Sequence, residues 1–163
     1  MTETGGFLRV RHAIRYPATV NEAPASLIDQ GKILIVDDKP ANVQLLEQVL
    51  EEAGYTRIRT TTQPREVEAL LSEIDPDIIL LDLQMPDLDG FAILARLKQI
   101  LPPGTFLPIL VLTANISYAT KIRALASGAH DFLTKPFDHA EVVQRVRNLL
   151  QTRLQLQMQS ASL

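Results

Sequence analysis

Apolar residues are distributed along this chain in two recurring patterns, short runs and longer amphipathic stretches. The runs "KILIV", "DIILL" and "PILVL" are apolar at nearly every position, which is typical of strands buried on both faces. Two further segments, "TRIRTTT" and "DFLT", have the β-branched and aromatic composition of strands. The predicted strands are residues 32–36, 56–62, 77–82, 108–113 and 131–134.

The stretches between these runs carry apolar residues at helical spacing. Pro40 suits a first helical turn, and the apolar stripe that follows it ends at Gly54. Asp138 and Glu141 have the spacing of a capping box, which predicts the start of the last helix. The predicted helices are residues 40–53, 64–73, 91–101, 118–127 and a segment that begins near 138.

Five strands that alternate with five helices predict an α/β fold. Because strands that are apolar on both faces need cover on both sides, the pattern indicates a doubly wound, five-stranded parallel sheet, a (βα)5 domain over residues 31–151. Residues 1–30 contain Gly and Pro without a sustained period and are interpreted as a flexible N-terminal extension. Residues 152–163 are interpreted as a continuation of the last helix and a C-terminal tail.

Polar residues that can do chemistry stand at the ends of four predicted strands. Each alone has a plain structural interpretation, as a helix cap, a turn residue, a packed hydroxyl or a surface lysine. In a parallel sheet, however, the carboxyl ends of the strands lie along one edge, where ligands bind. We therefore expect these side chains to converge. They are Asp37 and Asp38 after the first strand, Asp82 after the third, Thr113 after the fourth and Lys135 after the fifth.

Electrostatic repulsion makes such a convergence costly. Two carboxylates about 4 Å apart repel by roughly 4 kcal/mol at an effective dielectric constant of ~20. Three mutual pairs would approach ~12 kcal/mol, comparable to the whole stability of a domain. Lys135 offsets part of this repulsion. Either one carboxylate stays protonated or a divalent cation lies among them, and oxygen ligands without His or Cys nearby favour Mg²⁺, with Mn²⁺ as a substitute.

Composition narrows the classes of function. The 163 residues carry a net charge of −3, which argues against a nucleic-acid-binding surface. Without Cys the chain has no disulfide, Cys-ligated zinc or thiol nucleophile, a composition that suits a reducing cytoplasm. No apolar run approaches the roughly 20 residues of a membrane helix. We predict a cytoplasmic protein that contacts neither nucleic acid nor membrane directly.

A divalent cation, a carboxylate, a lysine and a hydroxyl together form a site that receives anions. Phosphoryl transfer requires mainly positioning and charge neutralisation from a protein, so a carboxylate of this cluster can accept a phosphoryl group as an aspartyl-phosphate. Lys135 and the metal would bind the phosphoryl oxygens, and Thr113 would donate a hydrogen bond.

Four segments resemble the signatures of the receiver domain of two-component response regulators. They are "ILIVDD", "LLDLQMPDLDG", "VLTA" and "GAHDFLTKPF", in the order and at the separations of that family. The resemblance covers roughly residues 31–151 and implies the flavodoxin-like receiver fold with strand order 2-1-3-4-5. The stretch "LPPGTFLP" departs from the pattern by lengthening the link into the fourth strand, at the end of the sheet opposite the site.

The resemblance implies a role for each matching residue. Asp82 resembles the phosphoacceptor, and Lys135 resembles the phosphate-binding lysine, followed by Pro136 in a bond that is usually cis in the family. Thr113 and Phe132 resemble the switch hydroxyl and the switch aromatic residue. The implied Mg²⁺ ligands are Asp37, Asp38, Asp82 and the backbone carbonyl of Gln84.

The same resemblance implies partners. A sensor histidine kinase or a phosphotransfer protein would supply the phosphoryl group, and a downstream protein or a missing effector domain would read the change. The chain would catalyse its own phosphorylation and dephosphorylation and would not otherwise be an enzyme. The last helix resembles a linker to a cyclic-di-GMP phosphodiesterase or cyclase domain. Its apolar stripe is interrupted by Arg153, and a homodimer through this helix, or through the surface of helix 4, strand 5 and helix 5, is a further expected interaction.

Two other functions are compatible with parts of the pattern. A degenerate receiver would keep the fold and act as a protein-binding module without chemistry. A phosphatase with an aspartate nucleophile carries a second Asp two positions after the first, where this chain has Gln84. The turn "DLDG" lacks the ligand spacing of a calcium loop.

Overall fold

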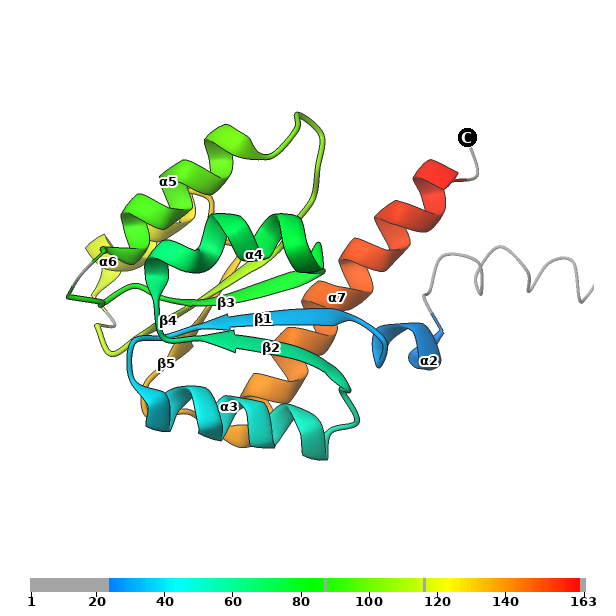
Figure 1. Cartoon of the computed structure of the whole chain (residues 1–163), viewed down its shortest axis with the longest axis horizontal. Coiled ribbons are helices and arrows are strands. Elements are labelled where there is room, and N and C mark those ends of the chain that lie inside the picture. The colour runs from blue at the N-terminus through cyan, green and yellow to red at the C-terminus, as the bar shows by residue number, and fades with distance from the viewer. Residues whose placement is uncertain (1–23, 87, 116, 162–163) are drawn as a thin grey trace, which may run out of the picture.

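The computed structural model describes residues 24–86, 88–115 and 117–161, so the N-terminal extension up to residue 23 lies outside the described residues. In the described part of the chain, strands and helices alternate after the short helix α2 (Figure 1). The strands are β1 (Lys32–Val36), β2 (Arg57–Thr61), β3 (Ile78–Asp82), β4 (Ile109–Thr113) and β5 (Asp131–Thr134). The helices are α2 (Ala25–Ile28), α3 (Pro40–Glu52), α4 (Val67–Ile74), α5 (Gly90–Ile100), α6 (Tyr118–Ala126) and α7 (His139–Ala161), and a 3₁₀ turn, η1 (Pro64–Glu66), precedes α4.

The five strands form one parallel sheet in the order β2-β1-β3-β4-β5, as predicted. Strand order reverses at β1, because the chain moves from β1 to β2 on one side and then crosses to β3 on the other. All carboxyl ends therefore lie along one edge of the sheet, and β1 and β3 are direct neighbours with Val36 in register with Leu81. This pairing places the residues after β1 beside the end of β3.

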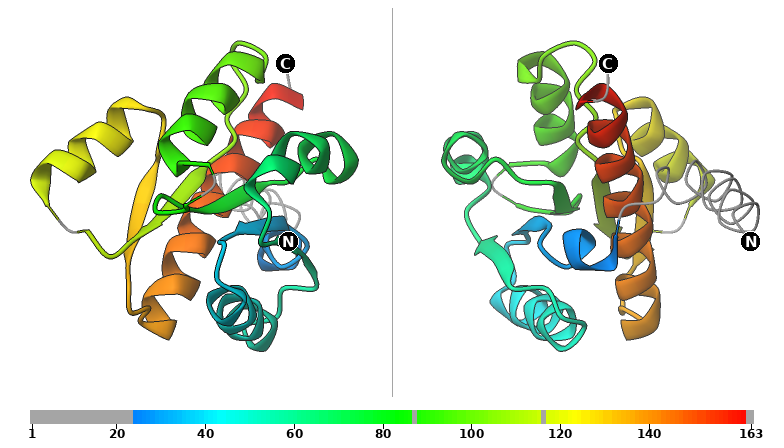
Figure 2. Two further views of the ribbon diagram at one scale, coloured as in Figure 1. Left: turned by 60° about the vertical axis from the view of Figure 1, so that its left-hand side comes forward. Right: turned by 90° about the vertical axis from the view of Figure 1, so that its right-hand side faces the viewer.

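Both faces of the sheet are covered, which explains why the central strands are apolar at consecutive positions. Ile33 and Ile35 pack with α2, α3 and α7, whereas Leu34 and Val36 pack with α4, α5 and α6. Figure 1 shows α4 and α5 on one side of the sheet and α3 on the other, and Figure 2 shows the same layering from two further directions. Burying each such side chain contributes roughly 1.5–3 kcal/mol.

Strand β2 lies at the edge of the sheet and is less buried than the central strands. Its residues alternate between exposed and partly covered, and Thr61 at its end is buried. Charged side chains such as Arg57 and Arg59 on an exposed edge also discourage pairing with another chain. The predicted strand of residues 56–62 is thus confirmed in type and shortened by one residue at each end.

The described end of the predicted N-terminal extension, residues 24–30, packs on the domain, whereas the prediction for residues 1–23 falls outside the described residues. Ile28 of α2 is 1% exposed and belongs to the core under α7. Gly31 approaches α7 so closely that an added Cβ would fall 2.9 Å from Leu150 Cδ2. The right-hand view of Figure 2 shows α2 beside α7. Helix α7 continues without interruption to Ala161.

Arg153 has a different environment from the one that the sequence suggests. It does not interrupt an apolar stripe on the surface, because it is 8% exposed and its Nε donates to Asp77 Oδ1 at 3.0 Å. Its Nη1 also donates to the carbonyl of Phe106, within the lengthened link into β4. Asp77 Oδ2 in turn accepts from the backbone N–H of Lys32 at 2.8 Å. Arg153 therefore ties α7 to the amino ends of the strands.

Candidate functional site

The loop after β1 holds two carboxylates beside the sheet. Asp37 is fully buried, and its Oδ1 accepts from the backbone N–H of Lys39 at 3.0 Å. Pro40 begins α3 at a position where the missing N–H costs nothing, so the chain turns sharply away from the sheet. Asp38 is partly covered. This turn keeps both carboxylates at the strand end while α3 leaves to cover the face.

Asp82 is the last residue of β3 and is also fully buried. Its Oδ1 accepts from the backbone N–H of Gln84 at 3.0 Å, which fixes the carboxylate against the following turn. Gly90 begins α5 so close to this strand end that an added Cβ would fall 2.4 Å from Asp82 O and 2.6 Å from Leu83 Cα. A glycine is required there because any larger residue would push α5 away from Asp82.

Lys135 brings the counter-charge. Its backbone N–H donates to Thr113 O at 2.9 Å, which ties the segment after β5 to the end of β4. The peptide bond between Lys135 and Pro136 is cis, as the resemblance implies. The ammonium Nζ lies 3.2 Å from Asp37 Oδ2 and 3.1 Å from Asp82 Oδ2, and the lysine side chain is 16% exposed.

Two oxygens of this cluster lack hydrogen bonds. Within residues 24–86, 88–115 and 117–161, the buried side-chain atoms without a hydrogen-bond partner are Asp38 Oδ1 and Asp82 Oδ2. Asp82 Oδ2 nevertheless forms an ion pair with Lys135 Nζ, 3.1 Å away. One oxygen from each of Asp37, Asp38 and Asp82 lies within 4.8 Å of the others. Unpaired carboxylate oxygens that converge in this way fit a hard divalent cation such as Mg²⁺.

The pKa of Asp82 reflects its burial and the excess negative charge in this cluster. Its pKa is raised from 3.8 to about 6, first because burial penalises the charged form and then because Asp37 is close. The Gln84 N–H and Lys135 act in the opposite direction and lower the pKa, without cancelling the increase. Three carboxylates against one ammonium group leave the cluster in need of further positive charge.

The remaining predicted residues lie around this cluster, and in the described part of the chain their side chains form no hydrogen bond with it. Thr113 is 2% exposed, and its hydroxyl accepts from the backbone N–H of Asn115 at 3.0 Å. Phe132 is partly buried against the core under α4, α5 and α6. Gln84 uses its backbone N–H on Asp82, while its side chain is exposed. The roles given to Thr113, Phe132 and the Gln84 carbonyl stay predictions.

One residue of the cluster was not predicted. Asn42, in the first turn of α3, donates through Nδ2 to Asp37 Oδ2 at 3.1 Å. It stands five residues after Asp37, and a polar side chain at a helix start ordinarily indicates a solvent-facing position or a cap. The sequence signal that could have indicated this contact is the position of Asn42 two residues after Pro40, where the helix begins next to the strand end.

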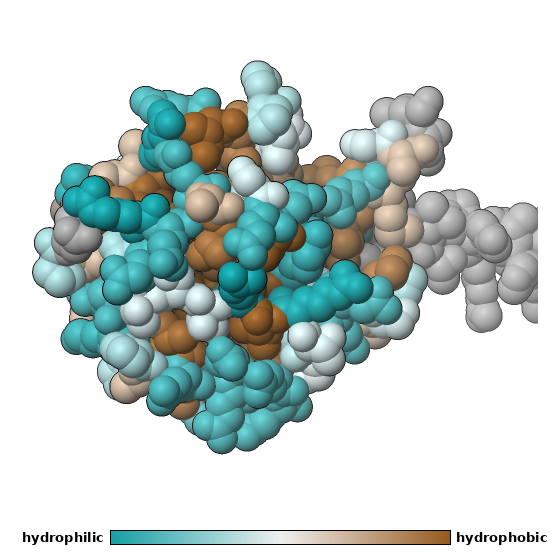
Figure 3. All heavy atoms as spheres, in the orientation of Figure 1, coloured by the Kyte–Doolittle hydropathy of each residue, from teal (hydrophilic) through white to brown (hydrophobic). Residues whose placement is uncertain are grey.

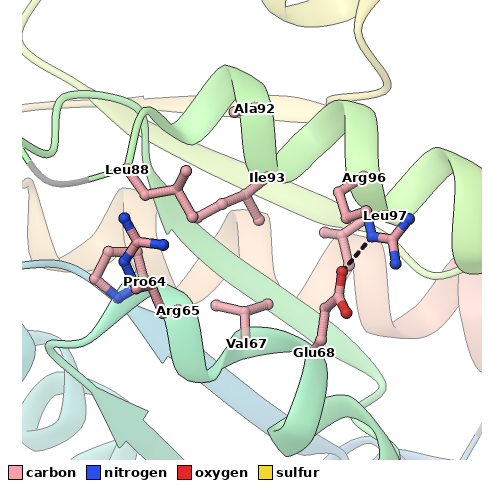
Figure 4. Close-up of a pocket in the computed structure, with 9 residues that line it drawn as sticks. All are labelled: Pro64, Arg65, Val67, Glu68, Leu88, Ala92, Ile93, Arg96 and Leu97. Atoms are coloured by element: carbon pink, nitrogen blue, oxygen red, sulfur yellow. Dashed lines mark hydrogen bonds and ion pairs between the residues drawn. The ribbon is translucent and has the colours of Figure 1, made fainter.

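A separate groove of about 260 Å³ lies between α4 and α5, away from the acidic cluster (Figure 4). Pro64, Val67, Leu88 and Ile93 supply apolar walls, and the carboxylate of Glu68 at its rim is paired with Arg96. Figure 3 shows that hydrophobic residues on this side of the molecule form separate patches among hydrophilic ones. The groove is lined mostly by apolar side chains, whereas the carboxylates and Lys135 lie together at the carboxyl ends of the strands.

The family model described as the response regulator receiver domain matches residues 33–147 of this sequence, a range that contains the whole cluster. This chain belongs to the response regulator receiver family. Receivers of this family are parts of two-component signalling systems, and the chain is a receiver domain of that kind.

Named relatives agree with this assignment. The chain is 42% identical over 119 residues to the DNA-binding dual master transcriptional regulator RpaA of Synechocystis sp., covering 73% of this chain and 48% of RpaA. It is 41% identical over 124 residues to the response regulator PleD of Caulobacter vibrioides, covering 76% of this chain and 27% of PleD. The receiver chain thus spans about half the length of one relative and about a quarter of the other.

Solved structures support the same fold. A putative response regulator from Chloroflexus aurantiacus has a TM-score of 0.68 and 37% identity, covering 74% of this receiver and 98% of that chain. A putative two-component system response regulator/GGDEF domain protein has a TM-score of 0.73 and 26% identity, covering 88% of this receiver and 58% of that chain. Among the described residues, none of the helices combines the length and the hydropathy that a bilayer crossing demands.

Proposed function

We propose that Asp82 accepts a phosphoryl group from a phosphohistidine and that the receiver thereby changes the surface it presents to a partner. The donor would be a sensor histidine kinase or a phosphotransfer protein. The observation that carries the proposal is the convergence of carboxylate oxygens from Asp37, Asp38 and Asp82 within 4.8 Å of one another, beside the Lys135 ammonium group. Two of the buried carboxylate oxygens in this cluster, Asp38 Oδ1 and Asp82 Oδ2, accept no hydrogen bond, although such oxygens normally do, which supports a cation and an anionic group that complete the site.

The divalent ion would be held by Asp37, Asp38 and Asp82, with the Gln84 carbonyl as a further ligand, and when bound it neutralises charge on the phosphoryl oxygens. The covalent step forms a bond between an Asp82 carboxylate oxygen and phosphorus. It breaks the P–N bond of the phosphohistidine, and the imidazole leaves with the electron pair and later takes a proton. Mn²⁺ would substitute for Mg²⁺ because both prefer oxygen ligands.

Other residues of the chain would then respond to the new charge. Lys135, now shared between Asp37 and Asp82, would bind a phosphoryl oxygen. The Thr113 hydroxyl would exchange its bond with Asn115 for one with the phosphoryl group, and Phe132 would move into the space that it vacates. The affected surface comprises α6, β5 and α7. The α6 part of this surface exposes large hydrophobic side chains, among them Tyr118, which is 80% exposed.

We infer that a separate protein or an effector domain outside this chain reads the surface, because the receiver spans a fraction of the relatives that it matches. A homodimer through the α6, β5 and α7 surface or through the extended α7 is part of the same proposal, as is a cytoplasmic location.

The test is incubation with acetyl phosphate and Mg²⁺, followed by intact-mass measurement. Wild type should gain one phosphoryl group, and Asp82→Asn should gain none. The matched control is Asp89→Asn, which keeps the cap of α5 because asparagine also accepts from the Phe91 N–H. An adduct that persists in Asp82→Asn would contradict the assignment, and wild type without any adduct would leave the receiver as a binding module.

A further inference from the structure

The first turn of α3 directs one side chain back at the acidic cluster, that of Asn42. Its Nδ2 donates to Asp37 Oδ2 at 3.1 Å. The backbone N–H of Asn42 already donates to Lys39 O at 3.0 Å, so the turn itself does not need the side chain. Lys39, the N-cap of α3, makes no side-chain cap bond. The Asn42 amide therefore serves the carboxylate after the preceding strand rather than its own helix.

The two adjacent carboxylates after β1 differ in how firmly they are held. Asp37 is fully buried, and both of its oxygens accept hydrogen bonds, Oδ1 from the Lys39 N–H and Oδ2 from the Asn42 amide, while Oδ2 also forms an ion pair with Lys135. Asp38 is only partly covered and has an oxygen without a partner. Asp37 is thus the fixed carboxylate of the pair, and Asp38 is the adaptable one.

Lys135 is shared between two carboxylates, because its Nζ is 3.2 Å from Asp37 Oδ2 and 3.1 Å from Asp82 Oδ2. Under the proposed function this ammonium group binds a phosphoryl oxygen, and its contact with Asp37 weakens. Asn42 then remains as the side-chain donor to Asp37 Oδ2 among the described residues. Without it, the bond from the Lys39 N–H to Oδ1 would hold only one side of this buried carboxylate, and Oδ2 could move away from the cation that it faces.

We propose that Asn42 is a positioning residue, which holds the Asp37 carboxylate toward the divalent cation through the bond from Nδ2 to Oδ2. This inference rests on the proposed function, because it assumes that the acidic cluster binds Mg²⁺. Donors that orient a metal ligand from outside commonly change metal affinity by about 10–100-fold when they are removed. Asn42 reaches the cluster from a helix that packs on the sheet, so its backbone is held in place relative to Asp37.

The test measures the dissociation constant of Mg²⁺ by titration calorimetry. Asn42→Ala and Asn42→Leu remove the donor, the second while keeping a side chain branched at Cγ, and each should raise the dissociation constant about tenfold. Gln44→Ala is the matched control, because Gln44 is exposed two residues further along α3, and it should bind as wild type does. Unchanged Mg²⁺ affinity in both Asn42 variants, measured well below their unfolding midpoints, would overturn the inference.

A second measurement separates positioning from general stabilisation. In a Lys135→Met background, Asp37 Oδ2 would depend on Asn42 alone, so Asn42→Ala should raise the dissociation constant by a larger factor than in wild type. Equal factors in both backgrounds would contradict the shared-oxygen argument. If wild type bound no Mg²⁺, the proposed function would be refuted. If wild type bound Mg²⁺ normally and the Asn42 variants bound it equally well, the role of Asn42 alone would be refuted.

Discussion

Replacing Asp82 by Asn should stabilise the metal-free receiver at neutral pH. Asparagine has nearly the same shape, and its Oδ1 still accepts from the Gln84 N–H that now binds Asp82 Oδ1 at 3.0 Å. The change removes a buried negative charge that faces Asp37 and leaves Lys135 paired with Asp37. The substitution thus isolates the free energy of holding an ionised carboxylate at this strand end.

The magnitude follows from the pKa of Asp82, which rises from 3.8 to about 6 on folding. Between these values the folded state binds more protons than the unfolded state, so stability falls as pH rises through this window. Above about pH 6 the full penalty applies, and two units at about 1.4 kcal/mol each give roughly 3 kcal/mol. As pH falls toward 3.8 the gain from Asp82→Asn should shrink, and it should vanish well below that value, where the carboxyl group is protonated in both states.

The assay is urea unfolding followed by circular dichroism between about pH 4 and pH 8, with a chelator present. Asp138→Asn serves as the control, because this exposed cap of α7 accepts from the Glu141 N–H and asparagine caps equally well. In a parallel series, Mg²⁺ at about ten times its dissociation constant should stabilise wild type by ~1.4 kcal/mol. The same addition should stabilise Asp82→Asn by much less.

Two outcomes would refute this reasoning. If Asp82→Asn changed stability by the same amount at every pH, the penalty would not come from ionisation of Asp82. If the variant were less stable than wild type at neutral pH, the carboxylate would be a net stabilising group through its ion pair with Lys135. Either result would remove the electrostatic argument for a bound cation.

The other predictions concern packing around the same sheet. Arg153→Met should cost about 1–3 kcal/mol in urea unfolding, because it leaves one oxygen of the partly buried Asp77 carboxylate without its donor, and Arg153→Met with Asp77→Asn should recover part of that loss. A loss below about 1 kcal/mol would show that the pair contributes little. Gly90→Ala should lower the free energy of unfolding by about 1–3 kcal/mol and slow labelling by acetyl phosphate, because the new Cβ would overlap Asp82 O. Labelling at the wild-type rate would contradict the role given to this close contact.

Most of the fold could be predicted because its signals are local. Continuous apolar runs define strands covered on both faces, and the residues at the ends of those runs meet for a topological reason. Asp82 and Lys135 are far apart in sequence, yet the parallel sheet alone is sufficient to bring them to one edge. The boundary that differed most, the 3₁₀ turn before α4, depends on a single turn at Pro64 that composition does not specify.

The contacts that could not be predicted are those made by single side chains across the fold. Arg153 reads as a polar interruption in an apolar helix, because its partner Asp77 lies 76 positions earlier in the chain. Asn42 reads as an ordinary residue of a first helical turn until the distance to Asp37 is known. Ile28 stands in a stretch without periodicity, and its burial depends on where α7 runs. In each case the decisive interaction is tertiary and leaves no local pattern.

The two ends of β3 provide an internal comparison for the orphaned oxygens. Asp77 precedes the strand, and both of its oxygens have donors, the Lys32 N–H at 2.8 Å and Arg153 at 3.0 Å. Asp82 ends the strand, is more deeply buried, and keeps one oxygen without a hydrogen bond. The same fold therefore satisfies both oxygens of a partly buried carboxylate where the carboxylate is structural. Because leaving an acceptor unsatisfied costs about 1–3 kcal/mol, the exception at Asp82 points to a group that the protein binds rather than to poor packing.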